Sequence, residues 1–481
     1  MEHGVQGAGQ LIAIAGRNEL ASSQLIAPGA QGGIAPSCVL QSTNNMSPGM
    51  ETATIRLDDI GRRVRTPLGT TAIAKWRRLE VILKVAERCN IDCSYCYFFH
   101  SGDDSHATHP AFIEQDTVEK VAQFLARTAR ESEIEELQID FHGGEPLMLK
   151  KERFEVMCQT LCAHLNFIPH FSMAMQTNAM LLDEGWVEII GRYNISVGVS
   201  LDGPKDYNDE FRVDHKGQGT YERTLQGMQL LEQARKDGKL LSRFGLICVA
   251  DSKRDARRTF NHFVDDLGQT DLNIGFPMVT HDTMNAAEVA GFKKYVCDLF
   301  DAWVERNDRR IRIRFIDQLL RALLSGAEGL ATAAQERPQH TYFTISSNGE
   351  VVGQDDERVF QAAFNNGVVA SGEFGLSAFY EVPAMRRYLS ARQEIGKKCQ
   401  SCVWGKVCAG GAAMGSNVQR YSKEKGFANE SVYCETLSAL LVKLTEYALA
   451  QGVPMERIAA VLVDDEGVPD ATNEPAELAT S

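Results

Sequence analysis

Apolar and polar positions follow a regular pattern from about residue 81 onward. Short stretches in which apolar and polar side chains alternate are separated by longer stretches with a helical period. A period of two is typical of β-strands, and a period near 3.6 is typical of amphipathic helices. The expected strands are residues 81–87, 136–141, 170–176, 195–201, 243–249 and 271–277.

Amphipathic helices are expected between these strands. One is predicted to start at a capping box formed by Asp116 and Glu119, and another at Ser252. Residues 285–325 have a mostly helical pattern, and strand signals after about residue 340 are weak. Six strand–helix units in series predict an α/β fold in which a parallel sheet curls into a partial (β/α)6 barrel, with its chemistry at the C-terminal ends of the strands.

The two ends of the chain lack this periodicity. Residues 1–50 contain eight glycines and only three charged residues, which predicts a mobile arm. The last residues are acidic and rich in Pro, Ala and Thr, which predicts a solvated tail. We expect five parts: a largely flexible extension at 1–75, the barrel at 76–310, a cysteine-rich domain at 311–436, C-terminal helices at 437–463 and the acidic tail at 464–481.

Composition and charge narrow the class of protein. The 481 residues are 44% hydrophobic and carry a net charge of −14, which argues against nucleic acid or an anionic membrane as partner. We found neither a run of about 18 apolar residues nor a signal-peptide core, so a cytoplasmic location is expected. In that reducing compartment, cysteines at short spacings are better explained as metal or cluster ligands than as disulfides.

Three cysteines follow the first predicted strand with C-x3-C-x2-C spacing: Cys89, Cys93 and Cys96. Three thiolates on one loop can hold three irons of a 4Fe-4S cluster and leave the fourth iron open for a small molecule. A zinc site is the alternative, although zinc sites normally use C-x2-C pairs and four ligands.

With Tyr95 before the third cysteine, this loop resembles that of the radical S-adenosylmethionine (radical SAM) enzymes, whose open iron binds SAM. Other motifs of that family follow the later strands in the expected order: His142-Gly143-Gly144-Glu145-Pro146, Gln176-Thr177-Asn178, Ser200-Leu201-Asp202-Gly203-Pro204 and Asn208 to Arg212. For each motif alone, an ordinary turn or helix cap is the alternative.

The resemblance implies a set of SAM contacts. The two glycines would let the backbone approach the SAM amino group, Glu145 would accept a hydrogen bond from that group, and Arg212 would pair with the SAM carboxylate. The residues at the ends of the third and fourth strands would contact the ribose. The expected cofactor-binding residues are Tyr95, Gly143, Gly144, Glu145, Asn178, Ser200, Asp202 and Arg212.

A second group of cysteines resembles the SPASM extension of radical SAM enzymes that modify peptides and proteins: Cys399, Cys402, Cys408 and Cys434. Full SPASM domains hold two auxiliary clusters. Here Gln354 and Ala412 stand where two ligands of the first auxiliary cluster are expected, whereas all four ligands of the second are present. The resemblance implies one auxiliary 4Fe-4S cluster beside the SAM cluster, and a four-cysteine zinc site is the alternative. Cys158, Cys162, Cys248 and Cys297 are expected in the core, and Trp404 is expected to be an ordinary packed residue.

Three segments, 95–99, 139–148 and 420–434, look most like the cyclophane-forming peptide maturases of the Xye type. This resemblance implies a carbon–carbon crosslink between an aromatic ring and the β-carbon of a nearby residue in a ribosomally made precursor peptide. A flavodoxin- or ferredoxin-type protein would supply electrons. The alternatives are thioether or formylglycine formation by another SPASM maturase, and an iron–sulfur or zinc protein that binds a peptide without catalysis.

One carboxylate is expected to act in catalysis. Rearomatisation of a crosslinked ring releases a proton, and sulfatase-maturating relatives place their catalytic aspartate directly after the cysteine whose position is Gln354 here. This carries over to Asp355. Asp356 is the adjacent alternative, and an aspartate in a solvated turn is the non-catalytic one.

Overall fold

The computed structural model describes residues 78–462 except 102, 326–339, 361–367, 372, 374, 377–394 and 415. The expected extension at 1–75, with Cys38, and the acidic tail at 464–481 therefore lie outside the described residues. None of the helices in the described part of the chain is long and apolar enough to cross a membrane.

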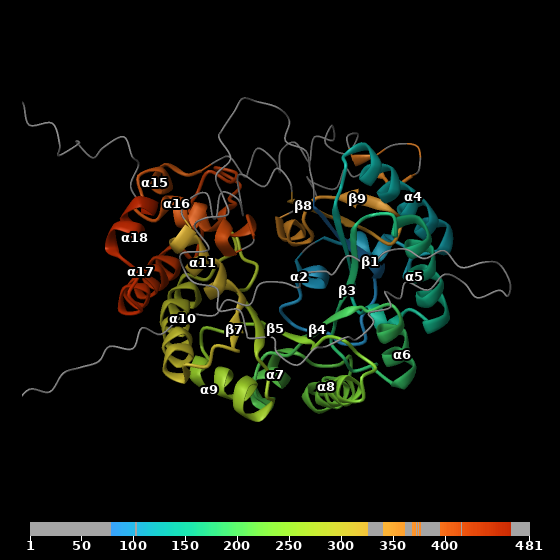
Figure 1. Ribbon diagram of the computed structural model, residues 1–481, viewed down its shortest axis with the longest axis horizontal. Coiled ribbons are helices and arrows are strands. Elements are labelled where there is room, and N and C mark those ends of the chain that lie inside the picture. The colour runs from blue at the N-terminus through green and yellow to red at the C-terminus, as the bar shows by residue number, and fades with distance from the viewer. Residues whose placement is uncertain are drawn as a thin grey trace, which may run out of the picture.

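The strands form one mixed sheet (Figure 1). They are β1 (Arg78–Ala86), β2 (Glu136–Gly143), β3 (His170–Thr177), β4 (Ser196–Ser200), β5 (Gly245–Val249), β6 (Asp271–Gly275), β7 (Arg312–Ile313), β8 (His340–Ile345), β9 (Glu350–Val352) and β10 (Val368–Val369). Their order is β10-β9-β8-β1-β2-β3-β4-β5-β6-β7. The pairs from β8 to β7 are parallel, whereas β9 and β10 add antiparallel pairs. The predicted parallel α/β fold is confirmed, and the six predicted strands correspond to β1 to β6.

Helices surround this sheet. They are α2 (Tyr97–His100), α3 (Ser105–Thr108), α4 (Gln115–Glu131), α5 (Lys151–Leu165), α6 (Glu184–Arg192), α7 (Lys205–Phe211), α8 (Tyr221–Lys236), α9 (Ala256–Asn261), α10 (Ala286–Arg306), α11 (Arg314–Ser325), α15 (Lys397–Gln400), α16 (Gly405–Cys408), α17 (Cys434–Ala450) and α18 (Met455–Leu462). Shorter helical turns are η1 (Pro146–Met148), the π-helical η2 (His262–Asp266), η3 (Asp355–Phe360), η5 (Ala409–Met414) and η6 (Val418–Arg420). The C-terminal helices gather at one side, where α17 packs on α10 (Figure 1).

Two predicted helix starts are wrong. The helix expected to begin with a capping box at Asp116 begins at Gln115, and its N-cap residue makes no side-chain hydrogen bond. The helix expected from Ser252 begins only at Ala256, because the Asp255 side chain caps it by accepting from the next backbone amides. In both cases the sequence contains a polar residue that could cap a helix, but the helix begins at a different nearby residue.

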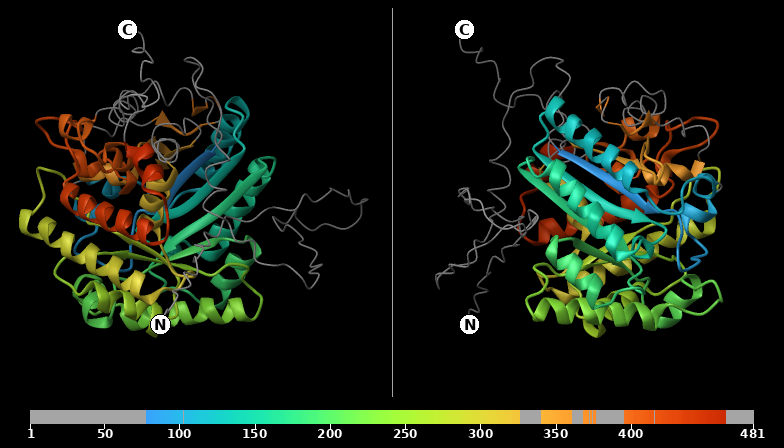
Figure 2. Two further views of the ribbon diagram at one scale, coloured as in Figure 1. Left: turned by 60° about the vertical axis from the view of Figure 1, so that its left-hand side comes forward. Right: turned by 90° about the vertical axis from the view of Figure 1, so that its right-hand side faces the viewer.

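Side chains along β1 alternate between two faces of the sheet, one packed in the apolar core and the other facing the inside of the partial barrel. Leu79, Val81 and Leu83 are fully buried with the apolar face of α4, and Figure 2 shows α4 and α5 lying along β1 to β3. Glu80 and Lys84 point to the opposite face, as successive strand residues do. The inner face of β1 therefore carries charged groups toward the site.

The sequence after residue 340 gave only weak strand signals, but this region does form strands. β8 pairs in parallel with β1 from Arg78↔His340 to Leu83↔Ile345, so the sheet continues beyond the six predicted strands. The chain then reverses into β9 through a turn in which Gly349 has φ +84°. This reversal carries η3 to the end of β1, where it packs against α2.

Candidate active site

The three cysteines of the first motif lie on the loop after β1. The Asp92 and Ser94 amides hold the loop by donating to backbone carbonyls of segment 211–213 at 2.8 and 3.1 Å. All three thiols are free, and burial raises the pKa of Cys89 to about 12 and that of Cys93 to about 11. These thiols would give up their protons when they bind iron, as cysteine ligands must.

The Gly143–Gly144 pair packs on the backbone that leads into this loop. A Cβ atom on Gly144 would lie 2.2 Å from the Arg88 carbonyl oxygen, and one on Gly143 would lie 2.1 Å from the Ala86 carbonyl oxygen. The Gly144 amide also donates to the Ala86 carbonyl at 2.8 Å. The glycines therefore let β2 close on the start of the cysteine loop, and their expected approach to the SAM amino group stays a prediction.

Glu145 is fully enclosed behind the same loop. Its carboxylate accepts from the Leu147 amide at 3.0 Å, the Thr177 hydroxyl at 2.7 Å and the Asn178 amide at 2.8 Å. Burial, only partly offset by these donors, raises its pKa to about 7. A carboxylate has about four acceptor positions, so these bonds leave room for about one more donor, such as an amino group.

Tyr95, Asp202 and Arg212 form a hydrogen-bonded triad in which Asp202 and Arg212 are buried and Tyr95 is half-buried. Arg212 donates to the Tyr95 hydroxyl at 2.8 Å, and that hydroxyl donates to Asp202. Burial raises the pKa of Asp202, although the nearby guanidinium opposes the shift. Among the described residues, Arg212 Nε and Asn90 Nδ2 are buried donors without a hydrogen-bond partner. Two such donors beside the cysteine loop suit a bound carboxylate, so the site fits SAM.

The remaining expected contacts lie at the ends of their strands. The Asn178 side chain donates to Asn90 Oδ1 at 2.8 Å, next to Cys89. Ser200 accepts from Gln176 at 3.5 Å. Seven of the eight expected cofactor-binding residues therefore lie at β-strand ends or in the loops after them. The eighth, Arg212, follows α7 and reaches the cysteine loop through its hydrogen bond to Tyr95.

A buried ion pair lies beside this constellation. Lys84 Nζ donates to Asp355 Oδ2 at 2.5 Å, and the two side chains are 0% and 3% exposed. The Tyr97 hydroxyl donates to the same oxygen at 2.5 Å. On its other side, Lys84 Nζ lies 3.0 Å from His142 Nδ1, and His142 Nε2 lies 3.0 Å from Gln176 Oε1.

Burial of Asp355 overturns the alternative of a solvated turn. Its neighbour Asp356 is half-buried: burial raises the pKa of Asp356 to about 6, against a hydrogen bond from Ser416. The turn η3 packs against α2 on one side and η6 on the other. The two aspartates thus face different regions, Asp355 toward the cysteine loop and Asp356 toward the C-terminal segment.

Sequence reasoning missed Lys84 and gave no role to Tyr97 or His142. The available signal was a lysine in the otherwise apolar run 81–85, at a position that alternation places on the inner face of the strand. Its partner lies 271 residues away along the chain, so the sequence alone did not pair them.

The second cysteine set surrounds one pocket of about 310 Å3. Cys399, Cys402, Cys408 and Cys434 line it together with Trp404, and all four thiols are free. They come from α15, the turn after it, α16 and the first residue of α17. Four thiols around one pocket suit a fully ligated iron–sulfur cluster. In the described ranges, we found no group of three or more His, Cys, Asp or Glu side chains placed to hold a single metal ion.

Positions of the absent ligands are occupied by other groups. Gln354 is buried, and its Oε1 has no hydrogen-bond partner among the described residues. Ala412 lies in η5. The other four cysteines expected in the core lie on helices and β5: Cys158, Cys162 and Cys248 are buried and Cys297 is half-buried.

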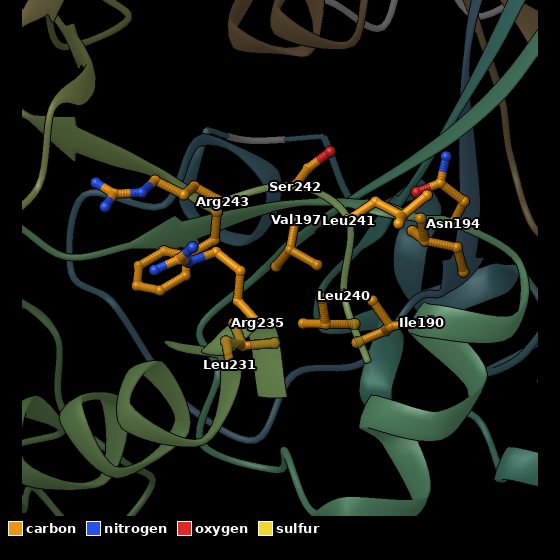
Figure 3. Close-up of a pocket in the computed structure, with 12 residues that line it drawn as sticks. Ile190, Asn194, Val197, Leu231, Arg235, Leu240, Leu241, Ser242 and Arg243 are labelled. Carbon is orange, nitrogen blue, oxygen red and sulfur yellow. The ribbon is translucent and has the colours of Figure 1, made fainter. Parts of the chain in front are cut away.

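A separate pocket of about 360 Å3 lies at the opposite end of the strands (Figure 3). Val197 at the start of β4 and segment 240–244 before β5 line it with residues of α6 and α8. It contains none of the cysteines or motif residues, so the candidate site remains at the C-terminal ends of the strands.

Comparison with known proteins agrees with this geometry. The model of the radical SAM superfamily matches residues 83–249. A cysteine-type anaerobic sulfatase-maturating enzyme of Clostridium perfringens is 24% identical over 376 residues, which are 74% of this chain and 94% of that protein. A serine-type enzyme of Bacteroides thetaiotaomicron is 25% identical over 281 residues, 53% of this chain and 65% of that protein.

A solved structure has the same fold. The structure described as native anSMEcpe with bound AdoMet and Cp18Cys peptide gives a TM-score of 0.64 at 21% identity, over 78% of this chain and 99% of that one. The cysteine loop, the motifs at successive strand ends and these matches lead to one conclusion. The chain is an enzyme with a radical SAM domain at residues 83–249, in a parallel α/β fold that it shares over most of its length with the solved anSMEcpe structure.

Proposed function

We propose that this enzyme oxidises a ribosomally made peptide and joins an aromatic ring to the β-carbon of a nearby residue. Two observations support the proposal: Asp355 is buried and held by Lys84 and Tyr97 between the cysteine loop and the auxiliary region, and Gln354 and Ala412 stand where two ligands of a first auxiliary cluster are expected. A carboxylate in that place suits a reaction in which a carbon-bound proton must leave after a radical step.

Cys89, Cys93 and Cys96 would hold the SAM cluster, and Arg212 and Glu145 would bind the SAM carboxylate and amino group. A 4Fe-4S cluster with SAM supplies a 5'-deoxyadenosyl radical, which removes a hydrogen atom from the substrate. Buried side chains around the site exclude water from that chemistry: Glu145, Asp202 and Arg212 are all less than a tenth exposed.

In the proposed reaction, the peptide loses two hydrogens overall. A C–H bond at the β-carbon and a ring C–H bond break, and one carbon–carbon bond forms. One hydrogen leaves as an atom, and the other leaves as a proton and an electron. Asp355 takes the proton on its carboxylate, and the four-cysteine site on the far side of η3 would suit a cluster with no open iron as electron acceptor.

Formylglycine formation is the second candidate, favoured by the similarity to sulfatase-maturating enzymes over most of their length. Against it, Gln354 and Ala412 replace ligands of the first auxiliary cluster expected in those relatives. A proton acceptor at Asp355 serves either reaction, so the residue alone does not separate them.

Product analysis tests the proposal. The reconstituted enzyme, dithionite and SAM are incubated with a cysteine-containing sulfatase-type peptide or with peptides encoded beside the gene. A crosslinked product loses two hydrogens, gives no fragment ions between the joined residues and does not react with a hydrazide. A hydrazide-reactive aldehyde from the sulfatase-type peptide would instead establish the second candidate. Absence of 5'-deoxyadenosine under all conditions would favour the non-catalytic alternative.

A further inference from the structure

Lys84 is a buried cation among polar groups of separate elements. Its side chain is 0% exposed, and its Nζ contacts Asp355 and His142 and lies 4.2 Å from the centre of the Phe98 ring. A buried ammonium is costly unless it is paired and hydrogen-bonded, so this arrangement couples Lys84 to the Asp355 carboxylate.

The hydrogen bonds around Lys84 have one consistent direction. An ammonium has three donors and no acceptor, so His142 Nδ1 accepts from it. His142 Nε2 then carries the proton and donates to Gln176 Oε1, whose amide in turn donates to Ser200. These hydrogen bonds hold Lys84 from the side of β2 and β3. The positive charge of its ammonium group faces the Asp355 carboxylate.

We propose that Lys84 is a positioning residue that keeps Asp355 ionised and oriented for proton uptake, with His142 holding Lys84 in place. This inference rests on the proposed function, in which a substrate proton moves to a carboxylate oxygen of Asp355. Asp355 becomes a neutral acid in that step, and Lys84 keeps its charge throughout.

Other charged groups lie on the turn and on the elements packed against it, but Lys84 is a cation that donates directly to the Asp355 carboxylate. Asp356 and Glu357 share the turn with Asp355 and are acidic, and α2 contributes the Tyr97 hydroxyl. Arg420 is the cation on η6, the element packed on the far side of the turn, and its guanidinium donates to Asn417 at 2.9 Å. Without Lys84, burial and like charges would raise the pKa of Asp355.

Two substitutions at Lys84 test this role. Lys84→Met keeps the length of the side chain and removes the charge, whereas Lys84→Arg keeps the charge. Lys151→Met is the matched control, because Lys151 also pairs with an aspartate, Asp183 at 2.7 Å, and lies over the Trp186 ring, but on the exposed surface.

The first readout needs no peptide. Infrared difference spectra of protein labelled with ¹³C-aspartate should show a protonated carboxyl group in Lys84→Met at neutral pH. This band should come in addition to those of other aspartates with a raised pKa that the wild type shares, such as Asp356. The additional band should be absent from Lys84→Arg and Lys151→Met, and absent again from Lys84→Met/Asp355→Asn. If Lys84→Met alone fails to fold, the double variant should restore folding, because it removes both buried charges.

The second readout is the pH profile of peptide modification. The rate of product formation by the wild type should not change with pH across the neutral range, because Asp355 stays ionised there. In Lys84→Met the rate should rise about tenfold per pH unit toward alkaline pH, with 5'-deoxyadenosine formation retained. A wild type that makes no modified peptide refutes the proposed function. A productive wild type with an unchanged profile and no new carboxyl band in Lys84→Met refutes the role of Lys84 alone.

Discussion

Replacing Gly144 by Ala should displace the cysteine loop rather than only weaken contact with a ligand. The new Cβ would lie 2.2 Å from the Arg88 carbonyl oxygen and 2.8 Å from the Cys89 backbone nitrogen. Those atoms belong to backbone and cannot rotate away, so β2 and the loop must separate. The separation would strain two hydrogen bonds, from the Gly144 amide to Ala86 at 2.8 Å and from the Glu145 amide to Arg88 at 2.9 Å.

The expected cost follows from these contacts. Overpacking of a tight site costs about 1 to 3 kcal/mol, and each hydrogen bond contributes about 1 kcal/mol, so the free energy of unfolding should fall by roughly 3 to 5 kcal/mol. Because the displaced atoms lead directly into Cys89, iron retention at the first site and SAM cleavage should fall together with stability.

The matched control is Gly275→Ala, at the end of β6. There a Cβ would meet its nearest atom, the Cys248 carbonyl oxygen, at an ordinary 3.8 Å. The assay combines thermal unfolding, iron content and 5'-deoxyadenosine formation for wild type and both variants. Full iron content and SAM cleavage in Gly144→Ala would show that the glycine does not position the loop.

Three further outcomes are expected. Replacing Cys89, Cys93 and Cys96 together by Ala should abolish 5'-deoxyadenosine formation. The iron content should fall from about eight to about four per chain, because each cluster holds four irons. A wild type with about twelve irons, or with zinc, would contradict the single auxiliary cluster. Arg212→Lys should weaken SAM binding, measured by calorimetry, because an ammonium lacks the planar fork of a guanidinium; an unchanged affinity would point to another carboxylate ligand. Asp355→Asn should lower the rate of peptide modification about 100-fold to 10,000-fold while SAM cleavage persists, and equal rates of modified-peptide formation in both proteins would place the base elsewhere.

Local sequence determined the main elements of the fold and the identity of the cysteine sites. Alternation and helical periodicity depend on neighbouring residues, and they located β1 to β6 and, with shifted starts, α4 and α9 between them. The C-x3-C-x2-C loop is equally local, and the positions of the motifs after successive strands follow from parallel connectivity, which brings the strand ends to one edge.

Tertiary structure decided what the motifs contact. β8 joins β1 after more than 250 intervening residues, and this long-range pairing leaves little signal in local periodicity. The same pairing brings Asp355 to Lys84, turning an aspartate that resembled a surface turn into a buried carboxylate. Packing also gave Gly143 and Gly144 their neighbour, because only the folded chain shows which backbone closes on them. The sequence therefore identified the chemistry of the ligands, whereas the fold determined how buried charges are paired and where the proposed proton acceptor lies.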